Sequence, residues 1–228
     1  MNDNTKKIVI FGAGQTAEIV YHYFVNDSPF SVVAFTVNAE HRDKKSLFGL
    51  PVVEFEEIEN KYPPDEFQMF VAMTYSNLNK LRAEKYKEAK QKDYTLVSYI
   101  SSKAGIVGKV DIGDNCLVLE NQLIQPYAKI GNNVFVWSGV LIGHNCTIGD
   151  HCWLTSDASI GGNTNIGSYS FLGLNCTIGH MINIGSNCLI GAGAQVTKDA
   201  VDNSVFISKD TDLFALDSER FMKISKLK

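Results

Sequence analysis

The stretch from Ile142 to Ile160, IGHNCTIGDHCWLTSDASI, places an aliphatic residue at every sixth position. The same spacing continues outward from Ile100 to Val196 without a miss, and it breaks at Asp202. A helix repeats its apolar positions every 3.6 residues and a strand every two, so a period of six fits neither. It predicts a parallel β-helix, in which each six-residue side of a coil sends one aliphatic side chain inward.

Two further positions of the six-residue repeat agree with this fold. The residue after the aliphatic one is often Gly, which we attribute to tight corners with φ values that only Gly adopts at low cost. Four positions after the aliphatic residue the side chains are mostly small, and all five cysteines occupy this slot: Cys116, Cys146, Cys152, Cys176 and Cys188. Because free Cys is among the most buried residue types, we expect these thiols to pack inside the prism.

Composition limits the remaining classes of protein. A chain of 228 residues with 45% hydrophobic residues can form one or two domains with a real core. The net charge of −4 gives no sign of a nucleic-acid partner or a polybasic membrane surface. The first residues lack the apolar run of a signal peptide, and no stretch approaches 18 apolar residues, so we expect a cytoplasmic protein with no membrane contact.

The chain divides into three expected parts. Residues 1–98 alternate strands (7–11, 31–35 and 68–73) with helices (16–25 and 76–90), which predicts a small βαβ sheet. Residues 99–200 form the β-helix. Residues 201–228 are expected to cap it, with a last strand at 204–208 and an amphipathic helix at 218–226 covering the open end. No Gly/Ser-rich linker separates the first two parts, so we expect them to pack together.

The first expected strand ends in Gly12-x-Gly14-x-x-Ala17 and opens a helix. Glycines let a phosphate approach the backbone, and a helix N-terminus favours its negative charge. A dinucleotide site also needs an acidic residue at the end of the second strand, where this chain has Thr36-Val37-Asn38. The motif therefore indicates a mononucleotide or nucleotide-sugar rather than NAD, and a turn without a ligand is the alternative.

Two of the five histidines share one position of the repeat. His144 and His180 each follow a corner Gly and lie 36 residues apart, which is two coils along one edge. At about 4.8 Å per coil they should be roughly 10 Å apart, too far to hold one metal ion within a chain. His151 occupies a different position and is expected to be solvated, and His22 and His41 are expected to be uninvolved.

These motifs, together with Ala192-Gly193-Ala194-Gln195-Val196-Thr197-Lys198, resemble the hexapeptide-repeat sugar acetyltransferases. The resemblance is to the group of sialic-acid O-acetyltransferases and bacillosamine-pathway N-acetyltransferases. It implies a Rossmann-like half domain that binds a nucleotide-sugar, a left-handed parallel β-helix, a homotrimer and acetyl-CoA as co-substrate without a metal.

The resemblance also assigns roles to residues. His144 matches the general base, Asn145 stands where relatives carry its acidic partner, and the Gly162 backbone N–H matches the donor to the thioester carbonyl. Trp153, Leu174 and Ala192 match positions lining the acetyl-CoA groove between subunits, although Trp153 can equally be an aromatic at a subunit contact. Residues matching the nucleotide site are Gly12, Gly14, Val37, Asn38 and Thr74.

The activity implied is direct N-acetylation of a nucleotide-linked amino-deoxy sugar for bacterial surface glycan synthesis. Three alternatives stay open at this point. One is O-acetylation of a sialic-acid-type sugar, and another is a non-catalytic nucleotide-sugar-binding protein. The third is a zinc enzyme of the carbonic-anhydrase type, whose third ligand position is Gly185 here, whereas catalytic zinc needs three protein ligands.

Overall fold

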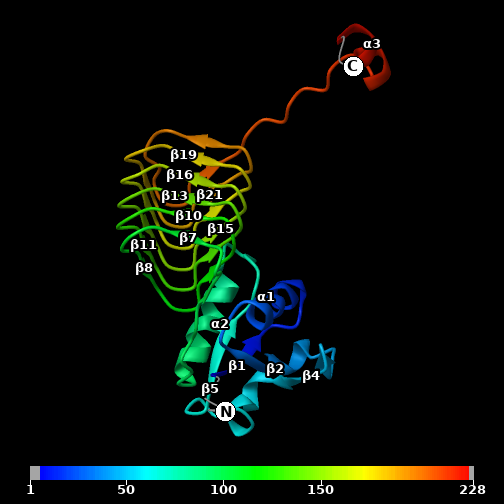
Figure 1. Ribbon diagram of the computed structural model, residues 1–228, viewed down its shortest axis with the longest axis vertical. Coiled ribbons are helices and arrows are strands. Elements are labelled where there is room, and N and C mark those ends of the chain that lie inside the picture. Colours follow the sequence, from blue (N-terminus) through cyan, green and yellow to red (C-terminus); the bar gives the residue numbers. More distant parts are fainter. Residues whose placement is uncertain (1–5, 226–228) are drawn as a thin grey trace.

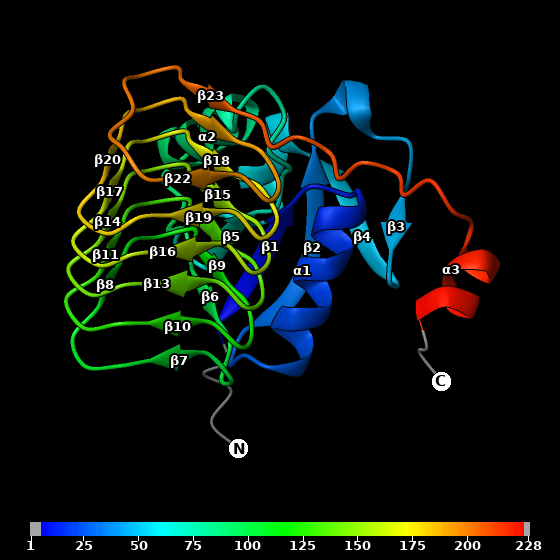
Figure 2. The ribbon, with the colours of Figure 1, turned by 90° about the horizontal axis from the view of Figure 1, so that it is seen from above.

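The structure is a computed structural model that describes residues 6–225. Figure 1 and Figure 2 show a small α/β part packed against one side of a tall stack of coils. The α/β part contains β1 (Lys7–Phe11), α1 (Gln15–Asn26), β2 (Ser31–Val37), η1 (Ala39–His41), β3 (Ser46–Leu47), β4 (Leu50–Glu54), η2 (Phe55–Asn60), β5 (Phe67–Val71) and α2 (Lys80–Gln91). Its sheet has the order β3-β4-β2-β1-β5, and only the β3–β4 pair is antiparallel.

The expected strands and helices of this part are present, with two differences. The five-residue strand β4, its two-residue partner β3 and the 3₁₀ segments η1 and η2 were not predicted; two-residue strands and 3₁₀ turns leave little periodic signal. The second helix begins at Lys80 rather than at residue 76. Asn77, Leu78 and Asn79 have φ values of 51°, 48° and 65°, and a left-handed turn cannot continue into a right-handed helix.

The coils form three parallel sheets. Sheet I contains β7 (Gly105–Ile106), β10 (Leu123–Ile124), β13 (Leu141–Ile142), β16 (Ser159–Ile160), β19 (Thr177–Ile178) and β22 (Gln195–Val196). Sheet II contains β8 (Asp111–Ile112), β11 (Lys129–Ile130), β14 (Thr147–Ile148), β17 (Asn165–Ile166) and β20 (Asn183–Ile184). Sheet III contains β6 (Tyr99–Ile100), β9 (Leu117–Val118), β12 (Phe135–Val136), β15 (Trp153–Leu154), β18 (Phe171–Leu172), β21 (Leu189–Ile190) and β23 (Val205–Phe206).

The predicted period is confirmed by the strand pairing. Ile142 of β13 pairs with Ile160 of β16, so each full coil takes 18 residues. The second residue of a strand is the repeat aliphatic, and most of these side chains are fully buried in one core with the five cysteines, all free thiols. The break at Asp202 is a two-residue deletion: Ile184 pairs with Ala200, so Ala200 fills the slot that Asp202 would occupy.

The reason given above for the repeated glycines is wrong. Glycines such as Gly143 and Gly167 do not have positive φ; the left-handed residue comes two positions later, for example Asn145 with φ 55°. A Cβ on Gly143 would lie 2.5 Å from the amide nitrogen of Gly162, in the next coil. These glycines are therefore required by the close approach of stacked coils, and Asn accepts the left-handed turn.

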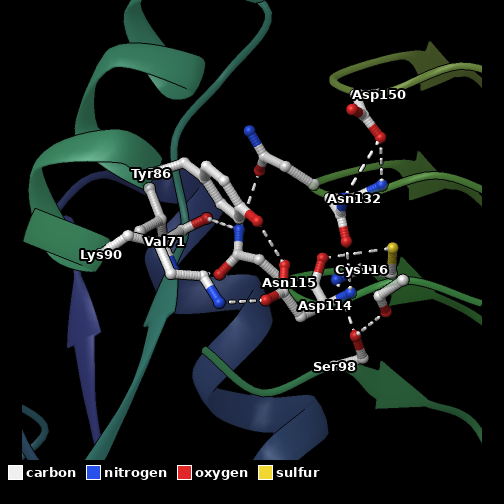
Figure 3. A network of polar contacts seen from close by, with 11 residues as sticks. Val71, Tyr86, Lys90, Ser98, Asp114, Asn115, Cys116, Asn132 and Asp150 are labelled. Carbon is white, nitrogen blue, oxygen red and sulfur yellow. Dashed lines mark hydrogen bonds and ion pairs between the residues drawn. The ribbon is translucent and has the colours of Figure 1, made fainter. Parts of the chain in front are cut away.

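The two domains share one apolar cluster, as expected from the missing linker. Outward-facing residues of sheet III, including Leu117, Phe135 and Trp153, pack against the β1–β5 sheet and α1. The rings of Phe70 and Phe135 stack with centroids 5.8 Å apart. Figure 3 shows the polar border of this contact: the N–H of Val71 donates to Oδ1 of Asn115 (2.7 Å), whose Nδ2 donates back to the Val71 carbonyl (3.3 Å). The Asn115 side chain thus extends the hydrogen bonding of β5 into the prism.

A buried cation crosses the same interface. Arg82 of α2 is fully buried, and its Nη2 donates to the carbonyl oxygens of Asn133, His151 and Cys152 at 3.1 to 3.2 Å. Its guanidinium carbon lies 4.3 Å from the ring centroid of Phe135. Burial lowers the pKa of Arg82 to about 9. Carbonyl dipoles and aromatic faces therefore stabilise this charge, and no ion pair to it is found in residues 6–225.

His151 is not solvated, contrary to the expectation. Only 6% of it is exposed, and its Nδ1 lies 2.9 Å from Nδ2 of Asn133. The surface that covers it comes from α2, whose Tyr86 ring packs edge-on against the imidazole. The repeat position alone could not reveal this cover, because α2 is distant in sequence.

Burial lowers the pKa of His151 to about 4. The positive charge of Arg82 also lowers this pKa, whereas the negative charge of Asp150 raises it. Between pH 6.5 and 4 the imidazole of His151 is therefore protonated in the unfolded chain but neutral in the folded chain. The free energy of unfolding that this group contributes above pH 6.5 is lost as the pH falls toward 4. The expected loss from this group is about 3 kcal/mol. His151→Asn, which suits the left-handed φ of 63° at this corner, should flatten that decline in denaturant unfolding at pH 7, 5.5 and 4.5. Parallel pH curves for the two proteins would contradict the prediction.

The C-terminal cap is not formed as expected. β23 does extend sheet III, but α3 (Ser218–Ser225) has no buried residue, and it lies away from the coils in Figure 1 and in Figure 2. The connection at 208–217 is extended and too exposed to hold α3 on the last coil. Residues 226–228, at the end of the predicted cap helix, lie outside the described residues. Across residues 6–225 no helix combines the length and apolarity needed to cross a bilayer.

Candidate functional site

The edge between sheets I and II carries a column of residues that follow the corner glycines. His144, Gly162, His180 and Lys198 occupy equivalent places at intervals of 18 residues, one per coil. The backbone N–H of His144 donates to Oε1 of Gln125 at 3.0 Å, which fixes the corner below the imidazole. Both histidine side chains are exposed in the single chain, and ligands can therefore reach them.

The structure brings His144 and Gly162 into direct contact. A Cβ built on Gly162 would lie 2.6 Å from Nε2 of His144, so the tip of the imidazole rests where a side chain would otherwise be. The N–H of Asn163 donates to the His144 carbonyl (2.8 Å), and the N–H of Met181 donates to the Gly162 carbonyl (3.0 Å). The N–H of Gly162 has no acceptor within residues 6–225. A base and an unused backbone donor thus lie side by side.

Asn145 is positioned to orient the imidazole. Its Nδ2 lies 3.0 Å from Nδ1 of His144, and as an amide donor it requires a lone pair there, which leaves the ring proton on Nε2. Turning the amide over places Oδ1 at Nδ1–H instead and leaves Nε2 free to accept a proton. A neutral Asn can support both tautomers, whereas a carboxylate would accept only the second.

The two imidazoles are closer than the sequence predicted. The ring centroids of His144 and His180 are 6.4 Å apart, not roughly 10 Å, with the ring planes at 57°. The rings approach because Gly162, in the coil between them, has no side chain. Within residues 6–225 no group of three or more His, Cys, Asp or Glu side chains is arranged to hold a metal ion.

Gly162→Ala should lower kcat by about 10²-fold, because misplacing a reacting group by about 1 Å has an effect of that size. The new methyl would overlap Nε2 of His144, and the ring must swing away. The melting temperature should change little, since the displaced atoms belong to an exposed side chain. The matched control is His22→Gln, which removes an exposed side chain from α1, away from this edge. Unchanged kcat in Gly162→Ala would refute the contact's importance.

The three residues expected to line a cofactor groove are not together. Trp153 is only 3% exposed and packs against Phe135 and Tyr75 in the interface between the domains, so its predicted role in binding acetyl-CoA is wrong. Leu174 is 56% exposed, and it lies with Ala192 on the edge between sheets III and I, one coil apart. That edge differs from the one carrying His144.

The α/β part has a tight turn at the end of β1, with open space beside Gly14. Gly12 has φ 122°, and a Cβ there would lie 2.7 Å from the Ala72 carbonyl oxygen, so this turn requires Gly. Gly14 is the N-cap of α1 and makes no side-chain cap, which leaves the first N–H groups of the helix uncovered. Thr74 lies just beyond β5, on the other side of β1 from β2, where the strand order reverses.

One carboxylate near this turn was not predicted from the sequence. Asn38 follows β2, and its Nδ2 donates to Oε1 of Glu56 (2.8 Å), whose Oε2 accepts the N–H of Ala39 (3.0 Å). Burial raises the pKa of Glu56, but hydrogen bonds from Asn38 and Ala39 outweigh it, so the net pKa is below its usual value. Glu56 therefore supplies, from η2, an acidic group beside Val37 and Asn38 that the adjacent sequence lacks.

The fold defines a class: a hexapeptide-repeat β-helix preceded by a parallel α/β domain. A family model described as the GMPPB C-terminal domain matches residues 112–213, which is less than half of the chain. No curated protein matches the sequence significantly.

Solved structures show the same architecture over nearly the whole chain. The acetyltransferase domain of PglB from Neisseria gonorrhoeae FA1090 superposes with a TM-score of 0.78 at 23% identity, covering 88% of this chain and 95% of that one. PerB from Caulobacter crescentus, in complex with CoA and GDP-perosamine, gives 0.78 at 24%, covering 87% and 92%. WeeI from Acinetobacter baumannii AYE gives 0.76 at 22%, covering 90% and 97%. Likeness at these identities establishes the fold.

Proposed function

We propose that the protein is an acetyl-CoA-dependent N-acetyltransferase acting on a nucleotide-linked amino-deoxy sugar, in the synthesis of a bacterial surface glycan. The observation that carries the proposal is the contact between Nε2 of His144 and Gly162, whose backbone N–H is unused. Acyl transfer to an amine needs both a proton acceptor and a donor to the developing oxyanion. The structural neighbours PglB and PerB support the choice, since one is named as an acetyltransferase domain and the other holds CoA and GDP-perosamine.

The reaction is direct transfer. The amine nitrogen of the sugar attacks the thioester carbonyl carbon, forming the C–N bond, and the carbonyl π electrons move to oxygen beside the Gly162 N–H. Nε2 of His144 takes the amine proton, with Asn145 turned so that Oδ1 accepts from Nδ1–H. The oxyanion then restores the carbonyl, the C–S bond breaks with its electron pair on sulfur, and the thiolate takes up a proton. The buried cysteines take no part: burial raises the pKa of Cys152 to about 12.

The active assembly is a cytoplasmic homotrimer of left-handed prisms. His144 and Gly162 lie on the edge between sheets I and II, whereas Leu174 and Ala192 lie on the edge between sheets III and I. A cofactor that touches both sets must bridge two copies of the chain, with each copy contributing one edge. In a trimer, the edge between sheets I and II of each copy faces the edge between sheets III and I of a neighbouring copy.

The α/β domain binds the nucleotide handle. Gly12 and Gly14 admit a diphosphate to the N-terminus of α1, and Val37, Asn38 and Thr74 surround the nucleoside beside the Glu56 carboxylate. Binding energy from the handle then orients the amine, which is how remote contacts accelerate a reaction at another point of the substrate.

Thiol release from acetyl-CoA tests the proposal. The acceptor panel contains UDP-, dTDP- and GDP-linked amino-deoxy sugars and free sialic acid. Release with one nucleotide-linked amino sugar is the expected result. Release with sialic acid alone would replace the N-acetyltransferase assignment by O-acetylation, and nucleotide binding without any release would make the protein a non-catalytic binder.

A further inference from the structure

We propose that the His180 imidazole is the second hydrogen-bond donor to the acyl oxyanion, together with the backbone N–H of Gly162. This inference rests on the proposed acetyl transfer. It assigns a role in transition-state stabilisation to a side chain two coils away from the base, on the same edge of the prism.

The position of His180 follows from the stacking. One coil above His144 the column has Gly162, which leaves a gap that the tip of the His144 imidazole enters, and one coil further it has His180. The two rings face each other across this gap with centroids 6.4 Å apart and planes at 57°. An atom placed over Gly162 is therefore flanked by one imidazole below and one above.

Three neighbouring backbone donors on this edge are already committed. The N–H of His144 donates to Gln125, that of Asn145 to the Pro126 carbonyl, and that of Met181 to the Gly162 carbonyl. In the described chain the backbone N–H groups of Gly162 and His180 have no acceptor, and that of Gly162 lies in the coil directly above His144. Oxyanion sites are most effective with more than one preorganised donor, and a neutral imidazole always carries one N–H.

His180 keeps its proton throughout the step. While the C–N bond forms, the negative charge on the carbonyl oxygen grows, and the N–H groups of Gly162 and His180 both donate to it. The proton that leaves the amine goes to His144. When the C–S bond breaks, the charge returns from oxygen to the carbonyl bond and both donors are released. The step therefore needs no co-reactant beyond acetyl-CoA and the sugar amine.

Three variants test this role in the full-length protein. His180→Phe keeps a ring of similar size without a donor, and His180→Gln restores an N–H donor. His22→Gln is the control, an exposed histidine on α1 outside the edge between sheets I and II. With the best acceptor of the panel, His180→Phe should lower kcat by about 10²-fold, with KM for both substrates within about threefold. His180→Gln should recover at least a tenth of the lost rate, and His22→Gln should match the unmodified protein.

The outcomes separate this inference from the proposed function. If the unmodified protein releases no thiol with any acceptor, the proposed function fails and takes the inference with it. If the protein is active but His180→Phe keeps kcat within threefold, only the role of His180 is refuted. A raised KM with unchanged kcat would also refute it, because it would mark a contact made equally in the ground state. Circular dichroism melts confirm that all three variants are folded.

Discussion

His144→Ala is expected to reduce kcat for acetyl transfer by about 10³-fold, within the range found for removal of a general base. The amine must lose a proton as the C–N bond forms, and the three atoms nearest to a Cβ built on Gly162 all belong to the His144 imidazole. The melting temperature and the affinity for the nucleotide should stay as they are, because His144 is exposed and belongs to the prism edge. Thiol release and isothermal titration with the nucleotide measure the two quantities.

The matched control for this variant is His22→Gln, which removes an exposed imidazole from α1. Its kcat should equal that of the unmodified protein. If His144→Ala kept more than a tenth of the original kcat while remaining folded, His144 would not be the base. The reaction would then rely on an amine that is already deprotonated in solution.

Arg82→Ala is expected to destabilise the protein by about 4 kcal/mol, the upper part of the range for a large buried side chain. The substitution opens a cavity against Phe135 and leaves the carbonyl oxygens of His151 and Cys152 without this donor. Denaturant unfolding followed by tryptophan fluorescence reports on it directly, because the Trp153 ring centroid lies 5.1 Å from the guanidinium carbon.

Two further variants show which property of Arg82 matters. Lys87→Ala removes a cation from the exposed face of the same helix, and it should change stability by less than about 0.5 kcal/mol. Arg82→Met keeps much of the volume and removes a charge that has no ion-pair partner in the described chain, so it should be clearly more stable than Arg82→Ala. Equal losses in Arg82→Ala and Lys87→Ala would show that the buried contacts contribute nothing.

The sequence predicted the prism well because its signal is local and periodic. Each coil repeats the same aliphatic, small and corner positions, so neighbours in space are neighbours at a fixed interval in sequence. The same logic placed His144, Gly162 and His180 in one column. It misjudged the distance between the rings, because side-chain direction is not contained in a backbone interval.

The failures all involve contacts without a fixed interval. His151 was expected to be solvated and Trp153 to lie at a groove or contact between subunits, yet α2 and the α/β sheet cover them. Glu56 reaches the end of β2 from a 3₁₀ segment with no helical periodicity. The last helix was predicted to be amphipathic and to cover the open end of the prism. In the structure it has no buried residue and lies beyond an extended connection, away from the coils. Each of these positions depends on packing between segments that are distant in the sequence. Such contacts follow no fixed interval, so the spacing of residues in a single sequence does not predict them.

The stacking of coils in units of 18 residues fixes the height of every residue along the axis of the prism. The α/β domain is fixed to sheet III at Tyr99, Leu117, Phe135 and Trp153, while His144 lies at a set height on another edge. These attachment points lie in coils both below and above His144, so the imidazole is held at one fixed height relative to the first domain. A molecule that spans the two domains must therefore match a single distance, which the stacked coils keep constant.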